Sequence, residues 1–576
     1  MIPSHRLRAA YLKARSTLLA ERNADGFWIG ELSSSALSTA TAVGALTLVD
    51  RPKHQAMIAT GMRWLVDHQN ADGGWGDTVK SFSNISTTML IRAAFALTGS
   101  EATYAESLKR CEAWLSERAG ATPDQRAEAI RRRYGKDRTF AVPILTMSAL
   151  AGLMPWNEIP RLPFELACLP QSWYRFARLP VVSYALPALI AIGQCIHRHR
   201  GTWNPLTKIL RWLGKNRSLR VLEQIQPSSG GYLEATPLTS FVVMSLASLD
   251  PLAHSPARRV IDLGVDFVVQ SMRPDGSWPI DTNLSIWVTT LSINALAAAG
   301  DLDSLDRQDI LRDWLLAQQM KLRHPYTGAP PGGWGWSHLP GSVPDCDDTP
   351  GAIVALRHLG VSDDHPAIVH GKTWMAGLQN SDRGFPTFCR GWGTLPFDRS
   401  GADLTAHALR AIEAPDHPGF VYLARQQRSD GSWLPLWFGN QHAPDDINPV
   451  YGTSRILAAY RDSHRIEDLE AKRGVAFLLS LQNNDGGWGG ARETPSSVEE
   501  TALVVEVLIG FGDEPRSAVM KGIEYLVQRV EDGTFTDASP IGFYFAKLWY
   551  FEKLYPIIFT VAALGRACQT LLSKHV

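Results

Sequence analysis

The sequence predicts an all-α protein whose helices form an α-solenoid or a closed αα-barrel. One short phrase recurs along the 576 residues, and a second helical pattern follows many of its copies. Strand patterns, in which apolar and polar residues alternate, are scarce. Tandem helix hairpins, here spaced by about 50 residues, are typical of solenoids and αα-barrels. The chain length favours two domains.

The recurring phrase reads Gly, an aromatic residue three positions later, Leu or Val, a Gln, and finally Asp-Gly-x-Trp. A clear copy is GMRWLVDHQNADGGW, which ends at Trp75. Apolar positions three or four residues apart predict a helix, and the Asn/Asp-Gly pair predicts the turn that ends it. The copies end at Trp75, Trp278, Trp433 and Trp488, with variants ending at Phe385 and Phe535 and degenerate copies ending at Trp28 and Tyr232.

The segments that follow the phrases predict the second helix of each hairpin. Examples are residues 88–97, 289–298, 351–359 and 501–510, which are rich in good helix formers. The last Trp or Phe of a phrase can pack on its own helix while the Gln bonds to a neighbouring turn. We therefore interpret the repeats as structural clamps, which by themselves indicate no particular chemistry.

The composition is that of a globular protein without a polyanionic partner. Hydrophobic residues make up 45% of the chain, charged residues make up 20%, and 57 Lys and Arg balance 57 Asp and Glu. This balance argues against a disordered chain and against nucleic-acid binding. Six widely spread cysteines without a C-x-x-C pair favour a reducing compartment. The first 21 residues lack the apolar core of a signal peptide, so we predict a cytoplasmic protein.

The most apolar stretch, residues 179–193, has two interpretations. It is too short to span a bilayer, and it contains Pro180 and Pro187. A buried core helix is the ordinary reading of such a run. A helix that rests in one leaflet of a membrane is the alternative.

The segment PDCDDT, residues 344–349, places three carboxyl groups within four residues. In a dry site Asp345, Asp347 and Asp348 cannot all ionise, so one of them keeps its proton at neutral pH. Such a proton is what the protonation of an isolated alkene requires. The structural alternative is a helix N-terminus, where Asp residues cap the helix and complement its dipole.

With this motif, the repeats resemble the QW motifs and the D-x-D-D acid motif of the squalene–hopene and oxidosqualene cyclases. The resemblance covers nearly the whole chain and includes the segments GFWIGEL, PWNEIPRLPFELACLP, SIWVTTL, DLTAHAL, PVYGT and GFYFAKLWYFEKLYP. It implies two αα-barrel domains in a dumbbell with a large apolar cavity between them. It also implies a class II terpene cyclase that protonates a linear polyprene, most simply squalene, to form a polycyclic triterpene such as hopene, without a cofactor or metal.

The resemblance divides the chain into three parts. Residues 1–29 would pack with the catalytic barrel, residues 30–271 would form a second αα-barrel with a candidate membrane-contacting helix, and residues 272–576 would form the catalytic barrel. The family is membrane-bound by monotopic contact, so the resemblance places the protein at the cytoplasmic face of the membrane. A homodimer is left open.

The resemblance also implies roles for the site residues. Asp347 would be the acid, and Asp345 and Asp348 would orient it and tune its acidity. His407 matches the histidine that pairs with this acid, and an imidazolium there would raise the acidity of Asp347. Asp403 lies one helical turn before His407.

Aromatic ring faces stabilise a carbocation without quenching it, because they are electron-rich and not nucleophilic. Seven positions match cavity aromatics of the family. These are Trp336, Trp437, Trp287, Phe388, Tyr544, Phe545 and Phe551.

The sequence departs from the family where the reaction ends. Thr239 stands where the bacterial cyclases carry a cavity Trp, and Thr41 and Leu90 stand where they carry two glutamates that help to end the reaction. The family's WDT reads Trp287-Val288-Thr289. The initiating half is retained and the terminating half is altered, so the product need not be hopene.

Three alternatives remain open. A class II cyclase of farnesyl or geranylgeranyl diphosphate needs basic groups for the phosphates, which Arg131, Arg132, Arg133 and Lys136 could supply. A zinc-dependent protein prenyltransferase-like subunit would use Asp, Cys and His ligands, and Cys346 and His407 would be candidates for them. A non-catalytic helical scaffold with an apolar groove is the third.

Overall fold

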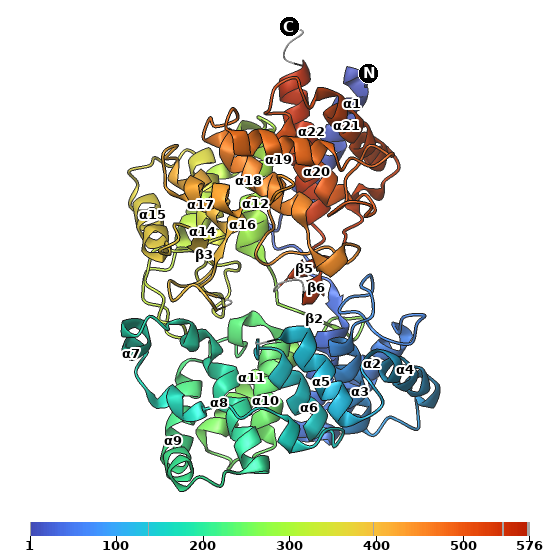
Figure 1. Cartoon of the computed structure of the whole chain (residues 1–576), viewed down its shortest axis with the longest axis vertical. Coiled ribbons are helices and arrows are strands. Elements are labelled where there is room, and N and C mark those ends of the chain that lie inside the picture. Colours follow the sequence, from blue (N-terminus) through green and yellow to red (C-terminus); the bar gives the residue numbers. More distant parts are fainter. Residues whose placement is uncertain (1, 136, 396, 544–546, 573–576) are drawn as a thin grey trace.

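The computed structural model describes residues 2–135, 137–395, 397–543 and 547–572. The chain forms two helical lobes, with the N-terminal and C-terminal helices together in one of them (Figure 1). Each lobe is built from an inner and an outer layer of helices. The predicted all-α fold with two αα-barrels is confirmed.

In the lobe that carries the acid motif, the inner helices form a closed ring, because each one packs on the next and α22 returns to α12. The ring consists of α12 (Ser285–Ala298), α14 (Asp348–His358), α16 (Ala402–Ile412), α18 (Pro449–Asp462), α20 (Val498–Leu508) and α22 (Tyr555–Leu572). The outer helices are α1 (Ser4–Ala20), α13 (Gln308–Ala317), α15 (Pro366–Leu378), α17 (Gly419–Gln426), α19 (Leu469–Leu479) and α21 (Arg516–Glu531). We call this the catalytic lobe.

The second lobe repeats the design. Its inner helices are α2 (Ala36–Asp67), α3 (Ile85–Thr98), α6 (Ala141–Leu150), α8 (Val181–Arg200) and α10 (Thr236–Ala247), and α10 packs back on α2. Outside them lie α4 (Ala105–Arg118), α5 (Pro123–Tyr134), α9 (Pro205–Gln224) and α11 (Pro256–Gln270), with the short α7 (Gln171–Phe176) beside α8. Asp50 has non-helical backbone angles and divides α2 into two halves. Only the first half belongs to the inner layer.

Strands are few and short, as the sequence predicts. All three pairs are antiparallel. They are β1 (Ser34–Ser35) with β2 (Trp278–Pro279), β3 (Phe385–Pro386) with β4 (Ser400–Gly401), and β5 (Ile541–Phe543) with β6 (Leu548–Tyr550). The first pair joins the two chain segments that cross between the lobes.

The repeats are clamps with a uniform set of hydrogen bonds. The Trp75 indole N–H donates to the carbonyl of Leu65, ten residues earlier, and its backbone N–H donates to Thr88 on the following helix. Gln69 donates both to its own turn at Gly73 and to the start of the next outer helix at Ser107. The predicted clamp is confirmed. The same pattern recurs at Trp433 and Trp488, and at Trp278 the backbone N–H donates instead to Thr39 of α2.

One repeat was not predicted. Trp334 makes the same bonds, to the carbonyl of Leu315 and to Thr349, and Gln319 joins Gly332 to Ala367. The indole reaches back 19 residues here, whereas Trp75 reaches back ten. The longer segment between the helix and the Trp hides the phrase from a search at fixed spacing.

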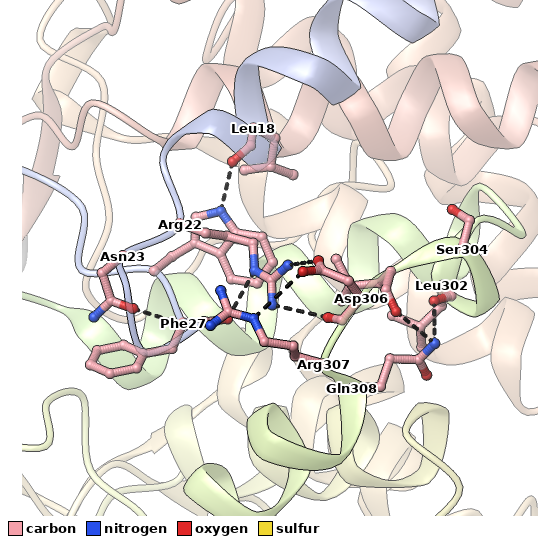
Figure 2. A network of polar contacts seen from close by, with 12 residues as sticks. Leu18, Arg22, Asn23, Phe27, Leu302, Ser304, Asp306, Arg307 and Gln308 are labelled. Atoms are coloured by element: carbon pink, nitrogen blue, oxygen red, sulfur yellow. Dashed lines mark hydrogen bonds and ion pairs between the residues drawn. The ribbon is translucent and has the colours of Figure 1, made fainter.

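The N-terminal segment is anchored to the catalytic lobe. Helix α1 packs on α21 and α22. Beyond α1, Arg22 pairs with Asp306, and Arg307 donates to the carbonyl of Ala24, so two chain segments that are far apart in sequence interlock (Figure 2). The division at residues 29/30 and 271/272 remains our proposal for the domain boundaries.

Helix α8, which contains most of the apolar stretch 179–193, is mostly buried in the second lobe. It is the one helix of the described chain that is long and apolar enough to cross a membrane, but two-thirds of its most apolar window, 67%, is covered by protein. Large apolar side chains are exposed instead on the neighbouring α7 and α9. They are Trp173, Phe176, Leu206, Ile209, Leu210, Trp212 and Leu213, and Trp203 is exposed just before α9.

Candidate active site

The acid motif forms the loop that enters α14. The backbone N–H of Asp345 donates to the carbonyl of Trp334, which ties the loop to the clamp. One oxygen of Asp345, Oδ1, accepts the backbone N–H groups of Asp347 and Asp348, each at 2.8 Å. Asp347 is the residue directly before the helix. The expected helix cap therefore exists, and Asp345 supplies it while it fixes the backbone of Asp347.

Burial and mutual repulsion keep protons on this cluster. Burial raises the pKa of Asp345 to about 7, although the hydrogen bonds that it accepts lower it in part. Burial, and then the charge of Asp345, raise the pKa of Asp348 well above its usual value. Because Asp345 accepts two backbone N–H groups, the shared proton belongs on Asp348, which donates it to Asp345. The pair thus carries at most one negative charge beside Asp347.

Asp347, directly before α14, pairs with His407 of the neighbouring inner helix α16. The distance from His407 Nδ1 to Asp347 Oδ1 is 3.0 Å. The side chain of Asp347 keeps 21% of its surface accessible and that of His407 only 4%, so the acid is the open member of the pair. Gly351 of α14 packs close to both Thr290 and the ring, since a Cβ there would lie 3.2 Å from Thr290 Oγ1 and 3.5 Å from His407 Cε1.

His407 is a neutral imidazole in this environment. Burial lowers its pKa to about 4, and the hydrogen bond to Asp347 only partly opposes this. The imidazolium that the sequence suggested is therefore disfavoured, because few groups nearby offset the desolvation penalty of a second buried charge. A neutral ring can still donate an N–H to Asp347 after the acid has lost its proton.

Asp403 lies one turn before His407 and is also fully buried. Burial, and then the charge of Asp347, raise its pKa to about 7. Its Oδ1 accepts the backbone N–H of Leu436 at 3.0 Å, whereas Oδ2 has no hydrogen-bond partner among the described residues. The site thus gathers four carboxyl groups around one histidine.

Trp287 is the predicted aromatic residue that lies beside His407, the partner of Asp347. Its ring meets His407 edge to face at 6.0 Å between centroids. Its indole N–H donates to the hydroxyl of Tyr555 at 3.0 Å, and that hydroxyl lies 2.9 Å from the hydroxyl of Tyr550. The two tyrosines were not singled out from the sequence, although both fall in or next to the matching segment GFYFAKLWYFEKLYP. The available signal in the sequence was that two tyrosines stand five residues apart in this segment.

Trp437 and Phe388 form a second aromatic group. The Trp437 indole N–H donates to Thr387 Oγ1 at 2.6 Å, and the Thr387 carbonyl accepts the backbone N–H of Cys346 in the acid motif. Phe388 meets Tyr184 of α8 at 5.3 Å. Aromatic residues of both lobes therefore meet next to the acid loop.

The remaining predicted aromatics are placed differently. Trp336 follows the clamp residue Trp334 by two positions, and its carbonyl accepts the backbone N–H of Trp287. Phe551 lies under the Lys80 ammonium, 5.0 Å from its ring centroid, at the junction of the lobes. Tyr544 and Phe545 lie outside the described residues.

One departure from the family, Thr239, is a clamp position, and so is Thr289, which the family shares. Thr239 Oγ1 accepts the backbone N–H of Tyr232, as Thr88 does for Trp75. Thr289 accepts the backbone N–H of Trp28 in the same way. A hydroxyl acceptor is needed at both positions to hold a repeat together, so the sequence there reports on the fold rather than on the cavity.

Within the described ranges, no group of three or more His, Cys, Asp and Glu side chains is arranged to hold a metal ion. Cys346 is fully buried, and burial raises the pKa of its thiol well above the usual value.

Family models and individual proteins match nearly the whole chain. The squalene-hopene cyclase N-terminal domain matches residues 12–192, and the squalene-hopene cyclase C-terminal domain matches residues 284–569. A probable squalene–hopene cyclase of Sinorhizobium fredii is 23% identical over 646 aligned positions, which cover 96% of each chain. Drimenyl diphosphate synthase of Streptomyces showdoensis is 31% identical over 291 positions, about half of each chain.

Among solved structures, the ent-copalyl diphosphate synthase from Streptomyces platensis has the same fold. The TM-score is 0.59 at 18% sequence identity, and the match covers 98% of this chain and 99% of that one. The two αα-barrels and the family matches together define a class II terpene cyclase. Within that class, the chain belongs to the squalene–hopene cyclase family. Family membership argues against the prenyltransferase and the scaffold alternatives.

Proposed function

We propose that this protein protonates the terminal double bond of a linear polyprene with Asp347 and cyclises the resulting carbocation. The observation that carries the proposal is the Asp347–His407 pair, in which the acid is the accessible member. The electron pair of the double bond takes the proton from Asp347, and the next double bond attacks the cation. His407 then stabilises the Asp347 carboxylate through its N–H.

We take squalene as the first candidate substrate, since the relatives that match over their full length are squalene–hopene cyclases. The aromatic residues Trp287, Trp437 and Phe388 support an apolar polyprene, because ring faces stabilise the cation along its path. The product is then a cyclic triterpene, with the number of rings set by the site where the reaction ends.

A prenyl diphosphate is the second candidate, and a basic pocket favours it. A pocket of about 1010 Å³ is lined almost entirely by residues of the second lobe. Its charged residues are Lys80, Arg118, Arg132, Arg133 and Asp72, together with Lys547. Arg133 Nε is buried and has no hydrogen-bond partner among the described residues. Burial, and then the charge of Arg133, lower the pKa of Lys547, although Asp446 opposes this in part. Such clustered cations favour an anionic ligand.

The basic patch suggested by the sequence needs one correction. Arg131 is paired with Glu128 and Glu158, so it is not available to a phosphate. Arg132 and Arg133 line the pocket, whereas Lys136 lies outside the described residues. The similarity to a drimenyl diphosphate synthase over half of the chain gives further support to this candidate.

One experiment separates the two substrates. The purified protein is incubated with squalene in detergent, and separately with farnesyl and geranylgeranyl diphosphate with and without Mg²⁺. Products are extracted, dephosphorylated where needed, and identified by gas chromatography–mass spectrometry. Cyclic products from any of these that vanish in Asp347→Asn support the acid mechanism. Cyclic products that persist in this variant would exclude Asp347 as the acid.

We further propose that α7 and α9 rest on a membrane surface. Leu206, Ile209, Leu210 and Leu213 are more than half exposed and fall on one face of α9. Lys208 and Lys215 are exposed on the same helix and suit anionic headgroups. The α7–α9 face, which replaces residues 179–193 as our candidate, lies on one side of the second lobe (Figure 1).

The same side offers a route for an apolar substrate. A pocket of about 830 Å³ lies between Arg175 next to the end of α7, Tyr184 of α8 and Phe388 of the catalytic lobe. We propose that squalene, which is insoluble in water, passes from the bilayer through this pocket toward the acid.

A further inference from the structure

A pair of buried carboxyl groups that the acid mechanism does not use lies where the two lobes meet. Asp281 stands in the segment that leads from β2 into α12, opposite Ala235 in an antiparallel bridge. Glu234 precedes Ala235, and its charge, after burial, raises the pKa of Asp281. Glu234 is 1% exposed and accepts hydrogen bonds from Ser229 Oγ and from the backbone N–H of Gly341, both at 2.7 Å.

The backbone around Glu234 is held in an unusual conformation. Leu233 and Glu234 both have positive φ angles, 57° and 54°, which side chains other than Gly rarely adopt. Consecutive residues of this kind persist only where the surrounding structure requires them. Gly341 meets this loop so closely that a Cβ there would lie 2.6 Å from Glu234 Oε1. The loop is therefore shaped to hold this carboxylate against the catalytic lobe.

Two complementary polar atoms are left unpaired beside this carboxylate. Asp281 Oδ1, an acceptor, and the indole Nε1–H of Trp336, a donor, are both buried without a hydrogen-bond partner among the described residues. The indole N–H lies close enough to the Asp281 carboxyl to favour its charged form, although no hydrogen bond of normal geometry joins them. Both residues are only partly covered as a whole, whereas these two polar atoms are buried.

Trp336 connects this place to the site of initiation. Its carbonyl accepts the backbone N–H of Trp287, whose ring contacts His407, the partner of Asp347. The loop that bears Trp336 also bears Trp334, whose carbonyl holds Asp345. The backbone hydrogen bond between Trp336 and Trp287 thus links the carboxyl pair to the acid.

We propose that Asp281, Glu234 and the Trp336 indole N–H hold the water molecule that ends the cyclisation. The water donates to Asp281 Oδ1 and accepts from the indole, which gives it the two or more partners that a buried water needs. A C–H bond next to the final cation breaks, and its electron pair forms the new double bond. The water takes the proton and returns one of its own protons to the carboxyl pair.

The carboxyl pair has the charge that this step requires. Two buried carboxyl groups that repel each other share one proton near neutral pH and keep one negative charge. That charge neutralises the proton that leaves the cation. The arrangement supplies a terminating group in a chain where Thr41 and Leu90 stand in place of the glutamates that the family uses.

This inference rests on the proposed function, and the same assay separates the two. Native protein, Asp281→Asn, Trp336→Phe and the control Glu499→Gln are compared on squalene, farnesyl diphosphate and geranylgeranyl diphosphate. Glu499 is another buried carboxyl of the catalytic lobe, and its amide keeps the acceptor for Ser539 N–H. Total substrate consumed and the ratio of products are both measured, in ordinary water and in H₂¹⁸O.

We expect the ratio of minor to major products in Asp281→Asn to rise at least about fivefold, whatever the total consumption, because the group that ends the reaction is altered while the acid is kept. Trp336→Phe keeps a ring face and should shift the ratio in the same direction, which preserves the test if Asp281→Asn does not fold. An unchanged ratio in both variants, at any total rate, overturns the inference. If native protein consumes none of the three substrates, the proposed function fails first. Native products that carry ¹⁸O would show that the water adds to the cation, which also overturns the proposed proton loss.

Discussion

His407 Nδ1 lies 3.0 Å from Asp347 Oδ1 and joins α16 to the residue that opens α14. The pair brings together two segments that are 60 residues apart in the sequence. Burial favours a neutral His407, so the catalytic proton belongs to the carboxyl cluster rather than to the ring. Five predictions concern the buried carboxyl groups, the clamps, the face of α9 and the basic pocket.

Asp347→Asn should lower the rate of cyclisation by a factor of about 10² to 10⁴, the usual contribution of a general acid. The amide keeps the size of the side chain but has no acidic proton. Glu499→Gln serves as the matched control and should retain the native rate. Product formation is followed by mass spectrometry, and thermal unfolding establishes that both variants fold. A rate within threefold of native in Asp347→Asn would refute the assignment.

Asp403→Asn should change the pH dependence of stability. The pKa of Asp403 is raised in the folded state to about 7 from its usual value near 4, so its contribution to stability is full below pH 4 and is lost as the pH rises toward 7. Asparagine has no such titration and keeps the acceptor for the Leu436 N–H. The variant should therefore gain stability relative to native as the pH rises, by at most roughly 4 kcal/mol.

This difference is measured by denaturant unfolding of both proteins at several pH values between about 3.5 and about 8, a range that spans both pKa values. A difference that stays constant over this range would show that Asp403 does not titrate as its environment indicates.

Gln427→Ala should destabilise the catalytic lobe by about 2 kcal/mol, because its amide joins the carbonyl of Gly431 to that of Glu470 in the next outer helix. Gln379→Ala is the matched control. Its amide bonds only to its own turn at Arg383, at an exposed position, and should cost less than about 1 kcal/mol. Equal losses in urea unfolding would show that the link between outer helices is not what stabilises the repeat.

Leu210→Glu combined with Leu213→Glu should reduce binding to vesicles of mixed neutral and anionic lipid by at least tenfold, because two apolar contacts of α9 become charged. Leu252→Glu combined with Leu322→Glu is the control, since both leucines are more than 80% exposed but lie outside α7 and α9. Binding is measured by vesicle flotation. Loss of binding in both pairs would indicate general adhesion rather than a defined face.

Arg133→Gln should raise the KM for a prenyl diphosphate by about tenfold or more and leave the turnover of squalene unchanged, because the guanidinium would contact only a phosphate. Arg131→Gln is the control, since its guanidinium is occupied by Glu128 and Glu158. Steady-state kinetics at two salt concentrations provide the measurement. No change in KM for farnesyl or geranylgeranyl diphosphate would place the phosphate elsewhere.

Local signals in the sequence predicted the helices, the clamps and the acid motif well. The Gln and Trp positions specify their bonds within one repeat, so Gln69 and Trp75 could be interpreted without a structure. The repeat that ends at Trp334 escaped because its extra residues break the spacing. The sequence left residues 179–193 open between a core helix and a membrane contact, because a short apolar run has the same composition in both places. The structure buries two-thirds of the most apolar window of α8, 67%.

The sequence by itself determined the all-α class, the repeated clamps and the presence of a carboxyl cluster, since each depends on residues that are close along the chain. Only the tertiary structure decided what surrounds each carboxyl group. It placed His407 against Asp347, drew Tyr550 and Tyr555 to Trp287, and left Asp281 unpaired between the lobes. Proton affinity depends on burial and on charges brought together across long chain separations, and these are properties of the folded ring rather than of any one segment.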